Sequence, residues 1–256
     1  MPHYNRRYKD LYDDEYDKYS GGDLWCDTND MYSLAGCPKH ITGDFMCYDN
    51  KIPSLRGGPE KVDGEYNCHE NKVTSLKYLA SFIGGGFDCS TNKLKSLIGC
   101  PKQVYGYFDC SYNNLKSLID GPQKVDSDYE CYGNQLTDFI GLASVIGGSF
   151  NCGNNKLKSL IGGPQHVNGQ YDCSENQITS LVGIHKIIKS CHEFIFDDDK
   201  IIHGGIGLLM IANLNKISCK SAPFAIIANY LGTGTKGMMA CSKELTTKGY
   251  EDYAAL

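Results

Sequence analysis

Apolar positions recur along most of the chain with a fixed spacing of 21 residues. Each block is centred on a cysteine, with a large apolar side chain two residues before it, another apolar residue five after it, and Ile or Val fifteen after it. The eight cysteines are Cys26, Cys47, Cys68, Cys89, Cys110, Cys131, Cys152 and Cys173. The alternation Phe-x-Cys predicts a short strand whose two apolar side chains point inward. So short a unit cannot bury its apolar face alone, so the repeats predict stacked coils with one shared core.

An asparagine follows each of these cysteines by three residues, as in Cys110 and Asn113. It stands where the chain turns out of the predicted strand, and its side chain can bond the backbone of adjacent coils. Gly-x-Pro, Gly-Pro or Cys-Pro further along most blocks predicts the next corner. The sequence therefore predicts an α/β repeat solenoid over residues 22–192, with a parallel β-sheet of about eight coils.

These blocks resemble the leucine-rich repeat family, for example in the segment from Phe108 through Cys110 and Asn113 to Leu115. The resemblance implies a parallel β-sheet solenoid that recognises other proteins. The usual leucine before the strand is absent, and a β-branched residue one place earlier makes the entry into each strand atypical. The chain is also similar to short repeat proteins of bacteria and tailed phages that end in a helical tail. That similarity implies a phage-encoded protein acting on its host.

Segments without the period flank the repeats at both ends. Residues 1–21 carry Tyr4, Tyr8, Tyr12, Tyr16 and Tyr19, a spacing that places them on one face of a helix. We expect a capping helix there, with a mobile arm or a partner-binding helix as alternatives. Residues 193–256 predict a helical cap or small helical domain. Within it we expect a last strand near Phe194 and helices over 207–217, 223–231, 238–245 and 250–256.

The chain has 13 cysteines, a net charge of −5 and a pI of about 5.8. Adjacent parallel strands hold their Cβ atoms too far apart for a disulfide, and the cysteine spacings match no zinc motif. We therefore expect reduced core thiols, no metal, no cofactor and a cytoplasmic location, in the host if the protein is phage-encoded. The net charge argues against direct nucleic-acid binding. No apolar run is long enough to span a membrane, so no membrane partner is expected.

Residues flanking the inward aromatic and cysteine must point to the other, concave face of the sheet. Four such positions in each of eight repeats hold 12 acidic residues and no Lys or Arg. Lysines occupy the following turn instead, at Lys51, Lys72, Lys93, Lys95, Lys116, Lys156 and Lys158. Aromatic residues, which are typical interface anchors, are interspersed among the acids. The predicted binding residues are Asp44, Glu65, Asp88, Asp109, Asp128, Glu130, Asp172, Trp25, Tyr48, Tyr107, Tyr112 and Tyr132.

Several functions fit this acidic, tyrosine-containing face. The favoured one is docking of a protein with a basic surface, such as a host nucleic-acid-binding or defence protein, with nucleic-acid mimicry as a variant. A structural virion or assembly protein is the alternative, and divalent-cation binding by the acidic ladder is a weaker one. No nucleophile–base pair stands out, so an enzyme is not expected. A cleft joining His192, Asp197 and His203 would reopen that possibility.

Overall fold

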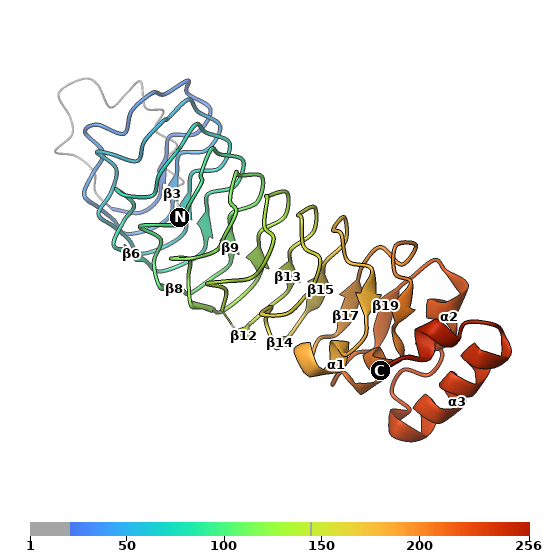
Figure 1. Cartoon of the computed structure of the whole chain (residues 1–256). Coiled ribbons are helices and arrows are strands. Elements are labelled where there is room, and N and C mark those ends of the chain that lie inside the picture. Colours follow the sequence, from blue (N-terminus) through green and yellow to red (C-terminus); the bar gives the residue numbers. More distant parts are fainter. Residues whose placement is uncertain (1–20, 144) are drawn as a thin grey trace.

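The computed structural model describes residues 21–143 and 145–256. Residues 1–20, where the Tyr-rich helix is predicted, lie outside this range. The chain winds into an elongated stack of coils that ends in a group of helices (Figure 1). The prediction of a parallel repeat solenoid with a C-terminal helical cap is confirmed.

One strand from each coil contributes to a ten-stranded parallel sheet that runs the length of the stack. Each step along it pairs residues in the same repeat position, as where Phe87 lies beside Phe108. Its strands, in spatial order, are β1 (Leu24–Trp25), β3 (Phe45–Met46), β5 (Tyr66–Asn67), β7 (Phe87–Asp88), β9 (Phe108–Asp109), β11 (Tyr129–Glu130), β13 (Phe150–Asn151), β15 (Gln170–Asp172), β17 (Glu193–Ile195) and β19 (Lys216–Ser218).

A second ladder of two-residue strands lies on another side of each coil. It comprises β2 (His40–Ile41), β4 (Lys61–Val62) and β6 (Phe82–Ile83), then β8 (Gln103–Val104), β10 (Lys124–Val125), β12 (Val145–Ile146) and β14 (His166–Val167). The pair β16 (Ser180–Leu181) and β18 (His203–Gly204) lies at an earlier position of its coils and is separate from this ladder. In the second ladder itself, each strand ends on an Ile or Val. These strands contain the β-branched residues that were expected to lie at the start of the cysteine-containing strands. Instead they form parallel strands of their own, and their inward Ile and Val side chains close the core.

The last strand predicted near Phe194 is confirmed as β17, and β19, which was not predicted, extends the sheet by one further coil. The strand centres move from Tyr171 to Phe194 to Ile217, so these last coils are 23 residues long and escape the shorter period. The helix predicted over 207–217 is wrong. That apolar segment forms a short 3-10 helix, η3 (Ile206–Met210), and then strand β19.

Helices close the C-terminal end of the stack. A single turn, α1 (Ile184–Ile187), lies within the late coils. After β19 come α2 (Ala222–Ala228), α3 (Gly234–Thr247) and the 3-10 helix η4 (Glu251–Ala254). Phe224 of α2 packs edge-on against Phe196 with ring centroids 4.8 Å apart, which joins the cap to the aromatic core. The sequence predicted α2 and α3 within a few residues.

All 13 cysteines are free thiols, and the eight repeat cysteines are buried in the core. Burial raises the pKa of these thiols far above the usual value, so they are neutral. Several donate a weak bond to the next coil, as from Cys89 Sγ to the Asp109 carbonyl at 3.3 Å. The predicted column of buried core cysteines is confirmed.

The asparagine ladder joins each coil to the one before it. Asn113 Nδ2 donates to the carbonyl of Cys89 in the previous coil and to those of Cys110 and Ser111 in its own, at 3.0–3.1 Å. Its Oδ1 accepts the Leu94 N–H at 2.9 Å. The same pattern recurs from Asn50 to Asn176. These bonds satisfy backbone groups that the short strands leave unpaired.

The choice between Tyr and Phe in the core depends on the residue eight positions earlier: the larger Tyr occurs where that residue is glycine, and Phe where it has a side chain. Tyr66, Tyr129 and Tyr171 follow the glycines Gly58, Gly121 and Gly163, whereas Phe occurs where that position holds Cys37, Leu79, Cys100 or Leu142. In the coil of Tyr171, a Cβ on Gly163 would lie 2.6 Å from the tyrosine hydroxyl oxygen. The hydroxyl therefore fills the space that a side chain fills in the other coils.

Candidate functional site

The predicted binding residues lie along the outward face of the ten-stranded sheet, but they do not form one uniform site. Two of the carboxylates are used within the fold. Asp44 Oδ1 accepts the Glu65 N–H at 2.7 Å, and Asp128 Oδ1 accepts the Ser149 N–H at 2.6 Å. Each carboxylate thus bonds the backbone of the next coil, where it replaces a ladder bond.

Glu65 and Tyr107 satisfy one another two coils apart. The Tyr107 ring lies over Gly86, where a Cβ would come within 2.5 Å of it, and its hydroxyl donates to Glu65 Oε1 at 2.5 Å. Burial, followed by the Glu65 hydrogen bond, raises the pKa of Tyr107, which keeps the hydroxyl protonated. This pair braces the face rather than presenting an unpaired charge.

A different situation holds for the carboxylates of Asp88, Asp109 and Glu130, which stand in register on β7, β9 and β11. One oxygen of each aspartate accepts the N–H two residues later, from Ser90 at 2.9 Å and Ser111 at 2.8 Å. Asp88 also lies 3.5 Å from His69 Nδ1. Among the described residues, neither Asp109 nor Glu130 has a cationic side chain within ion-pair distance.

Electrostatics single out the same two residues. Burial and then the Asp88 charge raise the pKa of Asp109 above its usual value. Burial and then the Asp109 charge raise the pKa of Glu130 from 4.5 to about 7. A half-buried carboxylate beside a like charge favours the neutral form unless a cation approaches. Asp109 and Glu130 are therefore where a basic group would gain most.

A shallow hollow of about 420 Å³ opens over this pair. Tyr112 and Tyr132 flank it with their rings 5.3 Å apart at 62°, and Tyr112 is 56% exposed. The rings have room because Gly133 and Gly153 stand beneath them. Tyr132 also donates to Glu175 Oε1 at 3.0 Å. The other residues that line the hollow are Ser90, Thr91, Ser111 and Asn151, which the sequence reasoning did not select although they share the same columns.

The remaining predicted residues lie outside this hollow. Tyr48 stacks on His69 with centroids 4.7 Å apart, closer to the N-terminal end of the sheet. Trp25 is half-buried on β1, the edge strand. Asp172 is occupied by its own turn, where it accepts from Ser174 N at 2.9 Å and from Ser174 Oγ at 2.6 Å. Of the predicted binding residues, Asp109, Tyr112, Glu130 and Tyr132 line the hollow, and Asp88 lies beside it on β7.

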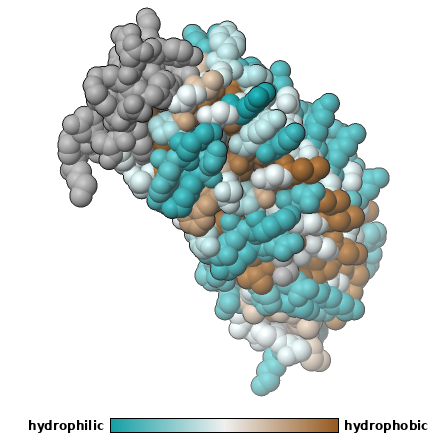
Figure 2. Space-filling model, turned by 90° about the vertical axis from the view of Figure 1, so that its left-hand side faces the viewer, coloured by the Kyte–Doolittle hydropathy of each residue, from teal (hydrophilic) through white to brown (hydrophobic). Residues whose placement is uncertain are grey.

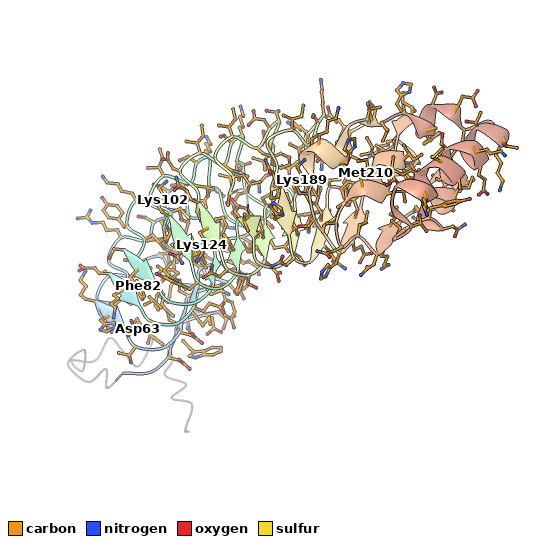
Figure 3. The ribbon with its side chains drawn as sticks, turned by 90° about the horizontal axis from the view of Figure 1, so that it is seen from below. Asp63, Phe82, Lys102, Lys124, Lys189 and Met210 are labelled. Atoms are coloured by element: carbon orange, nitrogen blue, oxygen red, sulfur yellow. The ribbon has the colours of Figure 1, made fainter. Side chains whose placement is uncertain are left out.

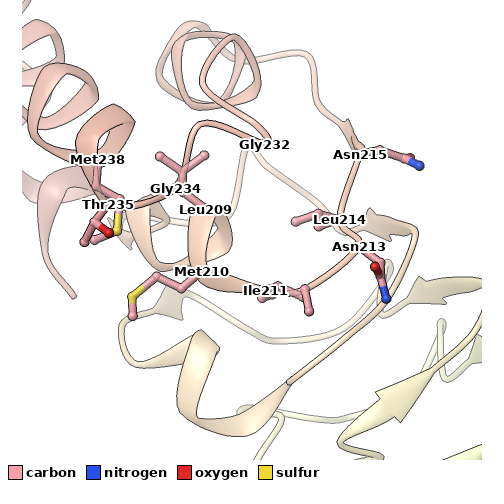
Figure 4. Close-up of a pocket in the computed structure, with 11 residues that line it drawn as sticks. Leu209, Met210, Ile211, Asn213, Leu214, Asn215, Gly232, Gly234, Thr235 and Met238 are labelled. Atoms are coloured by element: carbon pink, nitrogen blue, oxygen red, sulfur yellow. The ribbon is translucent and has the colours of Figure 1, made fainter.

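A second hollow of about 510 Å³ lies between the last coil and the helical cap (Figure 4). Its lining is largely apolar and includes Leu209, Met210, Leu214 and Met238, with Asn213, Asn215 and Thr235 at the rim. None of the described residues that line it is titratable. It lacks the charges that distinguish the hollow on the sheet.

Within residues 21–143 and 145–256, no group of three or more His, Cys, Asp and Glu side chains is placed to hold a metal ion. No helix in that part of the chain is long and apolar enough to cross a membrane. No family model matches the sequence, and no protein of curated function matches it significantly.

Replacing Glu130 with glutamine should change how stability depends on pH. The folded chain binds the Glu130 proton more tightly than the unfolded chain, so this group lowers stability as pH rises from about 4.5 to about 7. Glutamine has no proton to lose. We expect Glu130→Gln to match the wild type near pH 4.5 and to be more stable by about 2 kcal/mol at pH 8, after allowance for partial exposure. Urea unfolding at several pH values measures this, and a pH-independent difference would contradict it.

Proposed function

We propose that the chain is a protein–protein interaction module that binds a basic partner through the hollow around Asp109 and Glu130. The single observation that carries this proposal is a pair of half-buried carboxylates in adjacent coils, with no cationic side chain from residues 21–143 or 145–256 within ion-pair distance. Tyr112 and Tyr132 flank the pair and offer ring faces to an Arg or Lys side chain. A partner's cation would relieve the carboxylate repulsion that the free protein retains.

In this proposal, the other acidic residues of the face attract the basic partner from a distance and do not contact it in the complex. Several of these carboxylates are bonded within the fold, and they add to the negative field around the hollow. Such a field speeds the association of a basic protein and weakens as salt is added. The proposed partner therefore contacts a small central site inside a larger region of negative potential.

We further propose that the coils are leucine-rich-repeat-like and that the protein is phage-encoded and inhibits a host protein. The Phe-x-Cys-x-x-Asn-x-Leu blocks support the first part of this proposal. The acidic face supports a nucleic-acid-binding or defence protein as the target, because such proteins present basic surfaces. In that case the carboxylates would occupy a surface that otherwise contacts phosphates.

Capture from a bacterial lysate tests the proposed site. The variant Asp109→Asn with Glu130→Gln removes the two charges with little change of shape. The matched control, Asp126→Asn with Glu60→Gln, removes one Asp and one Glu charge elsewhere, where each pairs with an exposed lysine. We expect wild type and control to retain the same basic protein and the site variant to lose it, with capture strengthening as pH rises through 7.

Equal recovery by the site variant and the wild type would exclude this hollow as the binding site. If the captured protein binds nucleic acid, competition by duplex DNA separates mimicry from ordinary docking. Competition is expected only when the acidic face covers the phosphate-binding surface of the target. Continued capture in the presence of DNA would leave docking without mimicry.

A further inference from the structure

A row of exposed aliphatic side chains runs along the turn that follows the asparagine ladder. It occupies the ninth position after the repeat cysteine in five consecutive coils, and its members are 46–72% exposed. We call it the aliphatic row: Ile98, Ile119, Ile140, Ile161 and Val182. With coils about 4.8 Å apart, the row is about 19 Å long. Apolar side chains gathered along one side of the solenoid are visible in Figure 2.

The turn geometry forces these side chains outward. The side chain two residues earlier accepts the backbone N–H, as from Ile161 N to Ser159 Oγ at 3.2 Å and from Ile140 N to Asp138 Oδ1 at 3.0 Å. The next residue has a left-handed backbone, with φ of 84° at Gly162. The buried Leu or Phe that precedes each member anchors the turn to the core. The row is thus a rigid feature of the coils.

Unpaired basic residues accompany the row. Lys95, Lys116 and Lys158 precede its members by three residues, and Arg56 and Lys77 hold the same ninth position in earlier coils. Seven exposed basic residues lie along this turn, and we call them the basic flank: Arg56, Lys77, Lys93, Lys95, Lys116, Lys156 and Lys158. None has an ion-pair partner among the described residues.

This edge has few acidic side chains, and those present form an ion pair or a hydrogen bond within the protein. Asp120 lies 3.7 Å from Lys102 Nζ, and Asp138 bonds the backbone of Ile140. A chain with a net charge of −5 therefore carries one edge that is both apolar and cationic. Such an edge is complementary to an apolar layer with anionic groups at its surface.

Tyrosines extend the row toward the N-terminal end. Tyr32 is 67% exposed and Tyr78 is 44% exposed, and both line a hollow of about 580 Å³ together with Pro53 and Arg56. Lys77 Nζ lies 5.3 Å from the centroid of the Tyr78 ring. Tyrosine beside Lys and Arg is typical of the interface between headgroups and acyl chains.

We propose that this edge binds the surface of an anionic lipid bilayer. A row of aliphatic side chains on adjacent coils can enter a planar interface while the basic flank contacts the headgroups. This surface is separate from the hollow around Asp109 and Glu130, so the proposal is independent of the proposed partner. Lack of a long apolar run led us to expect no membrane partner, but stacking gathers side chains that are 21 residues apart in sequence.

Flotation of the full chain with vesicles tests this proposal. Vesicles of phosphatidylcholine with one third phosphatidylglycerol should carry the protein at low salt, and pure phosphatidylcholine vesicles should not. Ile119→Ser with Ile140→Ser should weaken binding about tenfold, because two of the five inserted side chains lose their apolar carbons. Lys95→Gln with Lys116→Gln should weaken it by a similar factor.

The matched control is Val145→Ser with Met239→Ser, which removes two equally apolar and exposed side chains away from the row. The outward side of the second ladder, where Phe82 and Lys124 lie, is seen in Figure 3. The control should bind like the wild type. Failure of the full chain to float with anionic vesicles at low salt would overturn the proposal. So would equal losses in the control and row variants, or unchanged binding by the lysine variant.

Discussion

Replacing Asn113 with aspartate is expected to lower the free energy of unfolding by about 4 kcal/mol, the largest effect we foresee for a single substitution. The Asn113 amide nitrogen lies 3.0–3.1 Å from three carbonyl oxygens in two coils. Aspartate puts an oxygen at this place, so three attractive contacts become repulsive and three buried carbonyls lose a donor. The remaining bond, from the Leu94 N–H, does not offset that loss.

The neighbouring Asn114 provides the control for this substitution. Its side chain is exposed, and only its backbone bonds the previous coil, from Asn114 N to the Leu94 carbonyl at 2.8 Å. Asn114→Asp introduces the same charge one residue away and should change stability by less than about 0.5 kcal/mol. Urea unfolding followed by circular dichroism compares the two. Similar losses in both variants would show that charge, and not the ladder bonds, determines the effect.

The same ladder bears on function, because it sets the positions of the charges on the sheet. Asn113 holds the end of β9 against the coil before it, and Asn134 does the same for β11 against the coil of β9. Asp109 and Glu130 project from β9 and β11 in strict register. Two carboxylates that could move apart would do so, since their mutual repulsion falls with distance. A fixed backbone prevents this and maintains the raised pKa of Glu130 in the free protein. In the proposed function, this fixed spacing would let the two carboxylates receive a partner's cation without rearrangement.

Periodicity in the sequence allowed the buried columns to be predicted because each column repeats eight times. The second ladder was missed because strands of two residues, such as Lys61–Val62, are too short to show alternation. The segment 207–217 was mistaken for a helix because it is almost continuously apolar. In the structure it stacks on β17 as part of a 23-residue coil, so the shared core prevails over local preference.

The acidic face could be predicted, but not which of its charges are unpaired. Asp44, three residues before its cysteine, and Asp109, one residue before its cysteine, were both predicted to face outward. Asp44 bonds the next coil, whereas Asp109 faces the hollow. That difference depends on how each side chain turns and on glycines such as Gly133 that let tyrosines lie flat. The aliphatic row was overlooked for a related reason. One isoleucine per turn is unremarkable until the coils place five such positions side by side.

In three coils the hydroxyl group of a core tyrosine lies beside a glycine eight residues earlier, and at Gly163 it leaves no room for a side chain. Gly163→Cys should lower the free energy of unfolding by about 3 kcal/mol, because the new Cβ would lie 2.6 Å from the Tyr171 hydroxyl oxygen in a fully packed core. Adding Tyr171→Phe removes that oxygen and recreates the pairing of Cys100 with Phe108. Most of the loss should then be recovered, with a coupling energy of about 2 kcal/mol.

Tyr171→Phe alone should change stability little, because its buried hydroxyl has no hydrogen-bond partner among the described residues. Removing an unsatisfied polar group gains about 1 kcal/mol, and the small void left beside Gly163 offsets part of that gain. A double-mutant cycle measured by urea unfolding under reducing conditions gives all three values. Additive effects of the two substitutions would show that the hydroxyl does not occupy the side-chain space. The coupling expected here would show that the residue at position 163 determines whether tyrosine or phenylalanine fits at position 171.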